Sequence, residues 1–388
     1  KDIAGVKMPQ DSMIRLMKGP KGSKVKITVN RNGTLIPFDI IRDKIPVHCI
    51  DAAFMIDETT GYIKLSKFTR TTYTEFTAAA ARLLAQGMTR LLFDLRDNTG
   101  GYFDQAWKLA NEFLERGDEV VYMEGRQRPR QNFDADGRGF LKDIQISVLI
   151  DEGTASSSEI FAGAIQDNDR GVIVGRRSFG KGLVQEPINF TDGSGIRLTV
   201  SRFYTPSGRC IQKPYGDDYQ YDIYERYAHG EMTSADSMKV DTTAVFYTVR
   251  GRRVYGGGGI IPDLFVPLDT TKATSFFINC NKKATQMRFA QSMFDRYGKT
   301  LAGIDDFDRL DRYMDEIDVA AQFLDYASRV DGLKPKEGEW EETAPYLMPQ
   351  LKALVGRFSK LSDEAFYRFY VPIDDTIQAA LKNPSVVE

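Results

Sequence analysis

Residues 146–185 read ISVLIDEGTASSSEIFAGAIQDNDRGVIVGRRSFGKGLVQ, and this stretch decides the fold. An apolar run leads into a Gly/Ser turn, an amphipathic segment, a second short apolar run and a lysine between two glycines. The pattern predicts a buried strand, a tight turn, a helix and a second strand. Ser156 stands where the turn becomes the helix, and Lys181 follows 181 − 156 = 25 residues later.

The same kinds of element surround this stretch. On its N-terminal side we expect a strand, a helix rich in alanine and an apolar strand, and this β-α-β order predicts neighbouring parallel strands in an α/β fold. Another helix and strand follow, then an Arg/Gly/Asp-rich exposed loop, and two further strands lie beyond Lys181. The expected ranges are 60–67, 73–86 and 89–95, then 103–115, 119–124 and the loop 125–139, then 183–190 and 196–206.

The two ends of the chain have a different character. Residues 13–42 predict a short amphipathic helix and a hairpin, because the strictly alternating run KVKITV precedes the Asn32-Gly33 turn signal and a second strand, Leu35 to Ile40, follows it. From about residue 275 onward apolar residues recur at helical spacing, interrupted by a turn-rich segment at 334–345. We therefore expect an all-helical C-terminal domain.

Bulk properties exclude several classes of function. The 388 residues carry a formal net charge of −2, so no global field attracts nucleic acid or an anionic membrane. No apolar run approaches the roughly 20 residues of a membrane span. Three scattered cysteines and two histidines, His48 and His229, argue against a disulfide framework and a His-rich metal site. We expect no metal and no cofactor.

Ser156 has two interpretations. With Glu159 it matches a capping box, so the simpler one is a helix cap with a core-facing stripe behind it. The chemical one uses the same place, because a helix N-terminus offers unpaired N–H groups and partial positive charge to an oxyanion. Ser157, the next residue, would donate one of these N–H groups.

Lys181 would be the base that activates the serine. A serine hydroxyl is a weak nucleophile until a base removes its proton, and an ammonium group accepts none. This role therefore requires dry surroundings, for which Phe179 and Leu183 are candidates. Gln185 lies four residues further, on the same face of the expected strand, and would orient the amine without adding charge. The simpler interpretation of Lys181 is a solvated loop lysine.

Two other motifs compete with this hypothesis. Residues 175–181 fit the spacing of a phosphate-binding loop, but Gly182 stands where the hydroxyl for magnesium belongs, and a strand rather than a helix is expected next. The turn at 94–101 ends in Gly100-Gly101, whose N–H groups suit an anion. Its acidic residues, with Asp104, lack the spacing of a calcium loop.

Taken together, these motifs resemble the carboxy-terminal processing proteases, or tail-specific proteases, which are Ser/Lys endopeptidases with an embedded PDZ domain. The matching pieces occur in the family's order over about residues 13–268: GPKGSKVKITVNRNG, GYIKLSKF, FDLRDNTGGYFDQAWKLANEFL, DEGTASSSEIFAGAIQDNDRGVIVGRRSFGKGLVQ and GGGGIIPDLFVP. The resemblance implies Ser156 as nucleophile, Lys181 as general base and Gln185 as its orienting residue. Gly100 or Gly101 would form the oxyanion hole with the N–H of Ser157.

The resemblance also implies an architecture. Residues 1–46 would be the C-terminal part of a PDZ domain, 47–270 a mixed βαβ-containing protease core of the crotonase-like/ClpP-like kind, and 271–388 a helical domain. Only the last third to half of a PDZ domain is recognisable, and the chain opens at Lys1 rather than Met, so we expect a trimmed chain.

A serine endopeptidase that cuts protein substrates near unstructured C-terminal tails is the expected function. The resemblance places it outside the cytoplasm, in the periplasm or cell envelope, with protein or peptide partners, no nucleic acid, no integral membrane segment and a possible homo-oligomer. The alternative is a non-catalytic peptide-binding scaffold with a degenerate protease fold.

Overall fold

The chain divides into two units, residues 1–48 and 49–388. The computed structural model describes residues 3, 6–31, 33–44, 48–216, 219, 221–271 and 273–383. Asn32 of the expected turn and the expected boundary at residue 46 lie outside these ranges. Each unit is considered by itself.

The first unit contains the expected hairpin. Helix α1 (Gln10–Met17) precedes β1 (Lys24–Arg31) and β2 (Thr34–Ile41), which pair antiparallel from Lys24↔Ile41 to Arg31↔Thr34. Gly33 has φ +85°, the left-handed conformation that a two-residue hairpin turn requires. The predicted hairpin is confirmed. Its assignment to a PDZ domain stays a prediction.

A six-stranded sheet organises the second unit, in the order β14-β9-β8-β5-β4-β3. Only β3 runs antiparallel to its neighbour, and the other pairs are parallel. The strands are β3 (Ile50–Met55), β4 (Thr60–Leu65), β5 (Arg90–Asp94), β8 (Gln145–Ile150), β9 (Val172–Gly175) and β14 (Leu264–Phe265). The expected α/β class with parallel neighbours is confirmed, and the predicted strands of this sheet differ from the observed ones by one or two residues at their ends.

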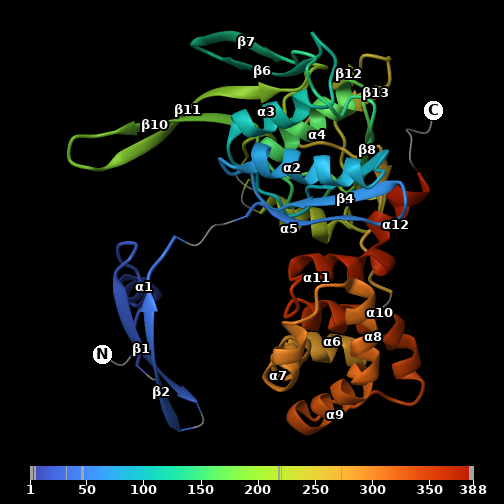
Figure 1. Ribbon diagram of the computed structural model, residues 1–388. Coiled ribbons are helices and arrows are strands. Elements are labelled where there is room, and N and C mark those ends of the chain that lie inside the picture. The colour runs from blue at the N-terminus through green and yellow to red at the C-terminus, as the bar shows by residue number, and fades with distance from the viewer. Residues whose placement is uncertain are drawn as a thin grey trace. The chain divides into compact units, whose positions relative to one another are not determined.

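Alternating side chains along these strands supply two cores. Phe93 and Val148 point to the face covered by α2 (Thr72–Ala85), α3 (Phe103–Asn111) and α4 (Ser157–Asp167). Leu92 precedes Phe93 and Leu149 follows Val148, so both point to the other face of the sheet. There Ile377 and Ala380 of α12 (Asp375–Lys382) pack against them. The sheet is therefore covered on both faces, and the second cover comes from the C-terminal part of the chain (Figure 1).

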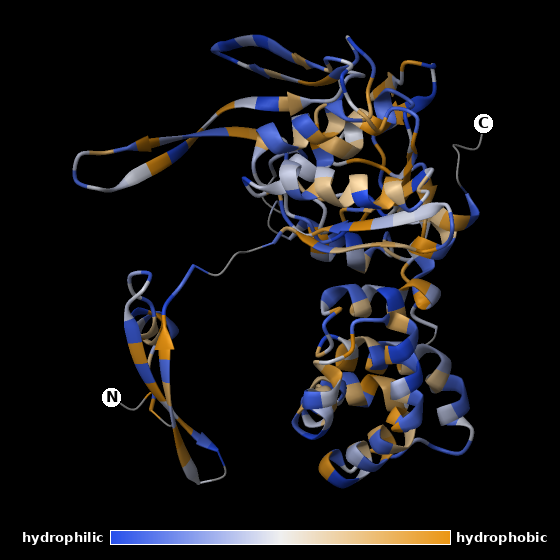
Figure 2. Cartoon of the chain, in the orientation of Figure 1, coloured by the Kyte–Doolittle hydropathy of each residue, from blue (hydrophilic) through white to orange (hydrophobic). Residues whose placement is uncertain are grey.

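A four-stranded antiparallel sheet adjoins this layer, in the order β10-β11-β6-β7. Its strands are β10 (Leu183–Asn189), β11 (Gly195–Tyr204), β6 (Glu119–Gly125) and β7 (Arg128–Asp134). The prediction of a loop over 125–139 is wrong because 128–134 pair with β6, from Glu119↔Asp134 to Gly125↔Arg128. The projecting β10–β11 hairpin carries hydrophobic residues, orange in Figure 2, among hydrophilic ones. Four of its hydrophobic side chains are 42–50% exposed: Ile188, Phe190, Ile196 and Leu198.

Short elements join this part to the C-terminal helices: α5 (Asp222–Ala228), a 3₁₀ turn at Ala235–Ser237, β12 (Val245–Tyr247) and β13 (Arg253–Tyr255). The helices that follow are α6 (Ser275–Lys282), α7 (Thr285–Leu301), α8 (Phe307–Glu316), α9 (Val319–Asp331), α10 (Glu339–Gly356), α11 (Asp363–Tyr370) and α12, with a 3₁₀ turn at Val371–Ile373.

The helical prediction for this part is confirmed. Helices α6 to α11 surround a core that includes Phe289, Phe323 and Leu351. The turn-rich interpretation of 334–345 is wrong from Glu339 onward, because α10 starts there and contains Pro345 and Pro349. Burial of Leu347 and Leu351 offsets the cost of prolines inside a helix.

Candidate active site

Ser156 occupies a strained turn between β8 and α4. It is the N-cap residue of α4 with φ +59° and ψ −116°, a conformation that costs a non-glycine residue about 1–3 kcal/mol. Gly100 lies directly behind the turn, since a Cβ there would come within 2.8 Å of the Ser156 Cβ and of the Ser157 nitrogen. The turn is therefore held in an unfavourable conformation against a second loop, and Ser156 remains partly exposed.

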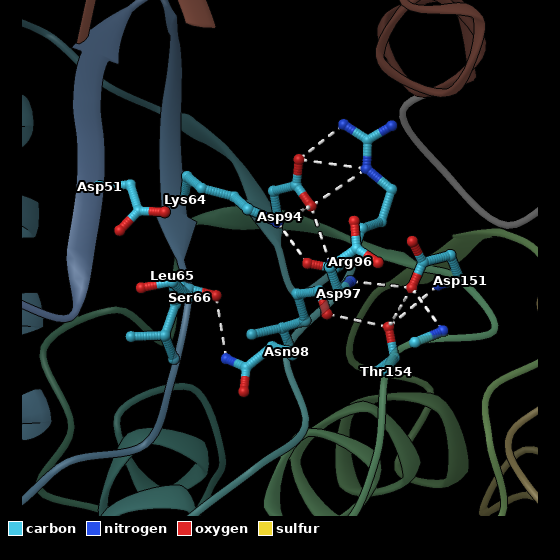
Figure 3. Close-up of polar contacts among 12 residues, drawn as sticks. Asp51, Lys64, Leu65, Ser66, Asp94, Arg96, Asp97, Asn98, Asp151 and Thr154 are labelled. Atoms are coloured by element: carbon cyan, nitrogen blue, oxygen red, sulfur yellow. Dashed lines mark hydrogen bonds and ion pairs between the residues drawn. The ribbon is translucent and has the colours of Figure 1, made fainter. Parts of the chain in front are cut away.

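Asn98 joins this second loop to the turn. Its carbonyl oxygen accepts the Ala155 N–H at 2.9 Å and the Ser158 hydroxyl at 3.0 Å. Its side-chain amide donates to the Leu65 carbonyl at 2.9 Å, at the end of β4 (Figure 3). Asn98 is fully buried, so these bonds are shielded from water. One asparagine thus links β4, the glycine loop and the start of α4.

Asp151 fixes the other side of the turn. Its Oδ1 accepts the N–H groups of Asp97 at 2.9 Å and Gly153 at 3.0 Å and the Thr154 hydroxyl at 3.1 Å (Figure 3). Burial, and next the nearby charge of Asp97, raise the pKa of Asp151, while the hydrogen bond from the Asp97 N–H opposes them. This carboxyl therefore organises the backbone of both loops.

The two loops leave two N–H groups available. Within the described chain, neither the N–H of Gly101 nor that of Ser157 has an acceptor, whereas the Gly100 N–H donates to the Asn98 Oδ1 at 2.9 Å. Gly101 has φ +153°, and a Cβ there would come within 1.9 Å of the Phe68 oxygen, so only glycine fits. The sequence did not decide between Gly100 and Gly101 as the oxyanion-hole donor. Of the two, Gly101 has the N–H group without an acceptor in the described chain.

Asp94 anchors the start of the glycine loop at the end of β5. It is fully buried and accepts the Tyr62 hydroxyl at 2.7 Å and the Lys64 ammonium at 3.2 Å. It also accepts the Arg96 guanidinium at 2.6 Å (Figure 3). Burial opposes ionisation, but the charges of Arg96 and Lys64 outweigh it and hold the pKa of Asp94 well below its usual range. Asp94 is therefore an ion-pair anchor and not a metal ligand.

Glu159 connects the serine turn to the lysine segment. Its Oε2 accepts the Ser156 N–H at 2.7 Å and the Lys181 N–H at 2.8 Å. Its Oε1 accepts the Gly180 N–H at 2.7 Å and the Ser178 hydroxyl at 2.6 Å. The predicted capping box is present, and the Glu159 N–H reaches the Ser156 carbonyl oxygen at 2.9 Å.

The side chains of Ser156 and Lys181 are not joined. No hydrogen bond links the Ser156 hydroxyl to the Lys181 amine, and among the described contacts that amine has no hydrogen-bond or ion-pair partner. Lys181 is exposed, although Phe179 beside it is partly buried. The dry surroundings expected for this lysine are absent from the described arrangement.

Gln185 faces another partner. Its side-chain amide donates weakly to the Thr199 hydroxyl at 3.4 Å and not toward Lys181. The expected alignment fails for two reasons: β10 begins only at Leu183, and a bulge between Val184 and Gln185 shifts the register. A bulge interrupts the alternation of faces on which the prediction depended. The catalytic roles of these three residues stay predictions.

Lys213 is a buried lysine that the sequence did not single out. It lies 7% exposed with its Nζ 2.9 Å from Asp222 and 4.2 Å from the centre of the Phe179 ring. Its N–H donates to the Gly180 carbonyl at 3.0 Å. No local motif marks it, because these partners lie between 9 and 34 residues away in the sequence.

The competing motifs find no support in this arrangement. Residues 183–189 form a strand, as predicted, so no helix follows 175–181 to receive a phosphate. The described residues contain no group of three His, Cys, Asp or Glu side chains that would hold a metal ion. In the same part of the chain, no helix is both long and apolar enough to cross a membrane.

Residues 59–223 match the model of peptidase family S41. The matched range contains the loop with Gly101, the turn with Ser156 and Glu159, and the segment with Lys181, so the site described above lies within it.

Curated relatives carry related names. The chain is 36% identical over 208 residues to the carboxyl-terminal-processing protease of Synechocystis sp., covering 52% of this chain and 48% of that one. It is 39% identical over 203 residues to the carboxy-terminal-processing protease of Bartonella bacilliformis, covering 50% and 46%. A probable CtpA-like serine protease of Staphylococcus epidermidis is 34% identical over 204 residues, covering 52% and 41%. The chain spans less than half the length of these relatives.

Among solved structures, the chain is similar to the photosystem II D1 C-terminal processing protease, with 31% identity and a TM-score of 0.40, over 50% of this chain and 54% of that one. A putative S41 protease from Bacteroides fragilis has 17% identity and a TM-score of 0.36, over 53% and 65%.

Proposed function

We propose that this protein is a serine endopeptidase that cuts polypeptide substrates, with a preference for unstructured C-terminal tails. One observation carries the proposal: Ser156 stands on a strained turn beside two N–H groups, of Gly101 and Ser157, that have no acceptor in the described chain. Such donors, aimed at a developing oxyanion, contribute a large share of the rate in acyl transfer.

The reaction would begin with a neutral Lys181. Its amine takes the proton of the Ser156 hydroxyl as Oγ bonds to the scissile carbonyl carbon, and the carbonyl electron pair moves to oxygen. The N–H groups of Gly101 and Ser157 bind that oxyanion. When the C–N bond breaks, the ammonium of Lys181 returns its proton to the leaving amine and an acyl-enzyme ester remains.

Water then resolves the ester. Lys181 takes a proton from the attacking water, a second oxyanion forms at the same N–H groups, and its collapse breaks the ester bond. The Ser156 oxygen leaves and regains a proton from Lys181. Gln185 would orient the amine in both halves, as a neutral donor and acceptor.

The described arrangement is a resting one in this scheme. Lys181 is exposed and unjoined to Ser156, so substrate binding would bring the amine to the hydroxyl and exclude water from both. The long, flexible side chain of Lys181 suits such a movement, because Gly180 and Gly182 on either side carry no side chain that would obstruct it. The family resemblance supports an extracytoplasmic location and a PDZ origin for residues 1–46, and both are part of this proposal.

Cleavage of an unfolded protein by the full chain tests the proposal. Wild type is expected to cut it, and Ser156→Ala and Lys181→Ala are each expected to abolish cutting. A fluorophosphonate probe should label wild type at Ser156 and leave Ser156→Ala unlabelled. Cleavage by Ser156→Ala equal to that of wild type would overturn the assignment. A wild type that binds unfolded protein and neither cuts it nor accepts the probe would indicate the non-catalytic scaffold instead.

A further inference from the structure

Glu159 is a buried carboxylate that no simple capping role explains. Its side chain is 0% exposed, yet it lies between three main-chain N–H groups and one hydroxyl. A cap needs only the bond to the Ser156 N–H. The other three donors belong to Ser178, Gly180 and Lys181, which are 19 to 22 residues away in the sequence.

The geometry divides these donors between the two oxygens. Oε2 receives the N–H groups of Ser156 and Lys181, the two residues of the proposed chemistry. Oε1 receives the Gly180 N–H and the Ser178 hydroxyl. All four groups donate, so the arrangement fits an ionised carboxylate, which only accepts.

Ser178 extends the connection on the far side. Its hydroxyl oxygen accepts the Ile260 N–H at 2.6 Å, and its carbonyl oxygen accepts a guanidinium N–H of Arg226 at 3.1 Å. Arg226 also donates to the Arg177 carbonyl at 2.7 Å. The segment 177–181 is therefore held on both sides, and Glu159 is its only described hydrogen-bonding link to the Ser156 turn through a side chain of α4.

We propose that Glu159 is a positioning residue that sets the Lys181 backbone in register with Ser156, so that only the lysine side chain has to move for catalysis. The inference rests on the proposed Ser/Lys function and adds to it a side chain that joins the two halves, beside the main-chain bond from the Phe179 N–H to the Thr154 carbonyl oxygen at 2.9 Å. A common oxygen at 2.7 and 2.8 Å from the two nitrogens leaves little freedom for either backbone to drift alone. Reacting groups displaced by about 1 Å lose on the order of 10²-fold in rate.

The replacement Glu159→Gln tests this inference in the full chain. The glutamine NH₂ group would face hydrogen-bond donors at one of the two positions that the Glu159 oxygens occupy. The four hydrogen bonds that Glu159 accepts therefore cannot all form. We expect kcat to fall by about 10²-fold with KM nearly unchanged, and labelling by the fluorophosphonate probe to slow in parallel. Glu112→Gln is the matched control, since Glu112 is a buried carboxylate that accepts the Tyr73 hydroxyl at 2.5 Å and the Phe140 N–H at 3.0 Å, away from the site. It should lower thermal stability and leave kcat and labelling unchanged.

The replacement Ser178→Ala distinguishes the contribution of Oε1 of Glu159 from that of Oε2. It removes a donor from Oε1 and leaves the pair on Oε2, so its effect on kcat should be much smaller than that of Glu159→Gln. Equal kcat values for wild type and Glu159→Gln, in a protein whose cleavage depends on Ser156, would overturn the positioning role and leave the proposed function standing. A wild type inactive with every unfolded substrate would instead remove the proposed function.

Hydrogen exchange in the unmodified protein provides a test that needs no variant to fold. The amides of Ser156, Gly180 and Lys181 share one carboxylate, so we expect them to be protected and to open together. A protected Ser156 amide beside freely exchanging amides at Gly180 and Lys181 would contradict the proposal.

Discussion

Arg96 and Asp374 form an ion pair, with 2.8 Å between Nη1 and Oδ2. Arg96 belongs to the loop that leads to Gly101, and it also binds the buried Asp94 at 2.6 Å. Asp374 is the N-cap residue of α12 and accepts the Ile377 N–H at 3.0 Å. The start of the last helix is thereby joined to the loop that supplies the proposed oxyanion donor.

Asp374→Ala should therefore lower the free energy of unfolding by more than the loss of a helix cap alone would. A cap is worth about 1 kcal/mol, and a hydrogen-bonded, partly buried charge adds about 1–2 kcal/mol. We expect the free energy of unfolding to fall by about 2–3 kcal/mol in denaturant titrations, with a decrease in kcat. Asp306→Ala is the control: Asp306 caps α8 by accepting the Arg309 N–H at 2.8 Å and has no ion pair among the described residues. Equal losses for the two variants would show that the ion pair contributes nothing.

Asp94→Asn should remove a pH-dependent part of the stability. The folded-state pKa of Asp94 is lowered, so its contribution is present above the unfolded value of about 3.9 and is lost as pH falls below it. At pH 7 the variant leaves Lys64 without its carboxylate and Arg96 with Asp374 alone, and breaking a buried pair costs about 3–5 kcal/mol. Melting temperatures of wild type and variant should differ widely at pH 7, begin to draw together below about pH 4, and converge only as pH falls toward the lowered folded-state pKa of Asp94. A difference that stays constant over this range would refute the ion-pair account.

Gly101→Ala should abolish cleavage. The added Cβ would lie 1.9 Å from the Phe68 oxygen, so the loop must move, and the free N–H moves with it. Loss of one oxyanion donor costs about 10²–10³-fold in kcat. Gly117→Ala is the control, because Gly117 also has a positive φ, +91°, but a Cβ added there would have no atom within 4 Å. It should keep its activity and lose only about 1 kcal/mol of stability.

Thr199→Val should test whether Gln185 acts on Lys181. The variant removes the 3.4 Å hydrogen bond that now holds the Gln185 amide. If this amide turns toward the lysine during the reaction, kcat should stay equal or rise by up to about 5-fold, since a competing bond worth about 0.5–1 kcal/mol is gone. Gln185→Ala should lower kcat. Should Thr199→Val lower kcat as much as Gln185→Ala does, the present Gln185–Thr199 contact would be the working one.

Local patterns predicted the parts of this site that depend on local structure. The strand, turn and helix around Ser156 follow from an apolar run, a Gly/Ser turn and a capping box, which lie within a few residues of each other. The first bond of Glu159, to the Ser156 N–H, belongs to the same pattern. Its bonds to 178–181 could not be read from spacing, because they depend on how β9 returns beside β8.

The failed predictions have equally specific causes. The Gln185 alignment assumed a regular strand, and a bulge at Val184/Gln185 has no sequence marker as clear as a turn dipeptide. Strand β7 was missed because its residues are polar and largely exposed, and only pairing with β6 makes them a strand. Helix α10 contains prolines whose cost is offset by burial against distant helices.

The placement of α12 has a consequence for how the protein is made. Arg90 is the first residue of β5, the strand that follows α2. It donates to the carbonyl oxygen of Ala380, which lies 290 residues later in the sequence. During synthesis the sheet face that carries Leu92 and Leu149 stays without this cover until α12 has left the ribosome. Contacts of such long sequence separation form late and slowly. The nascent chain would thus gain this cover, and a fixed glycine loop, only after the 290 residues that separate Arg90 from Ala380 have been added.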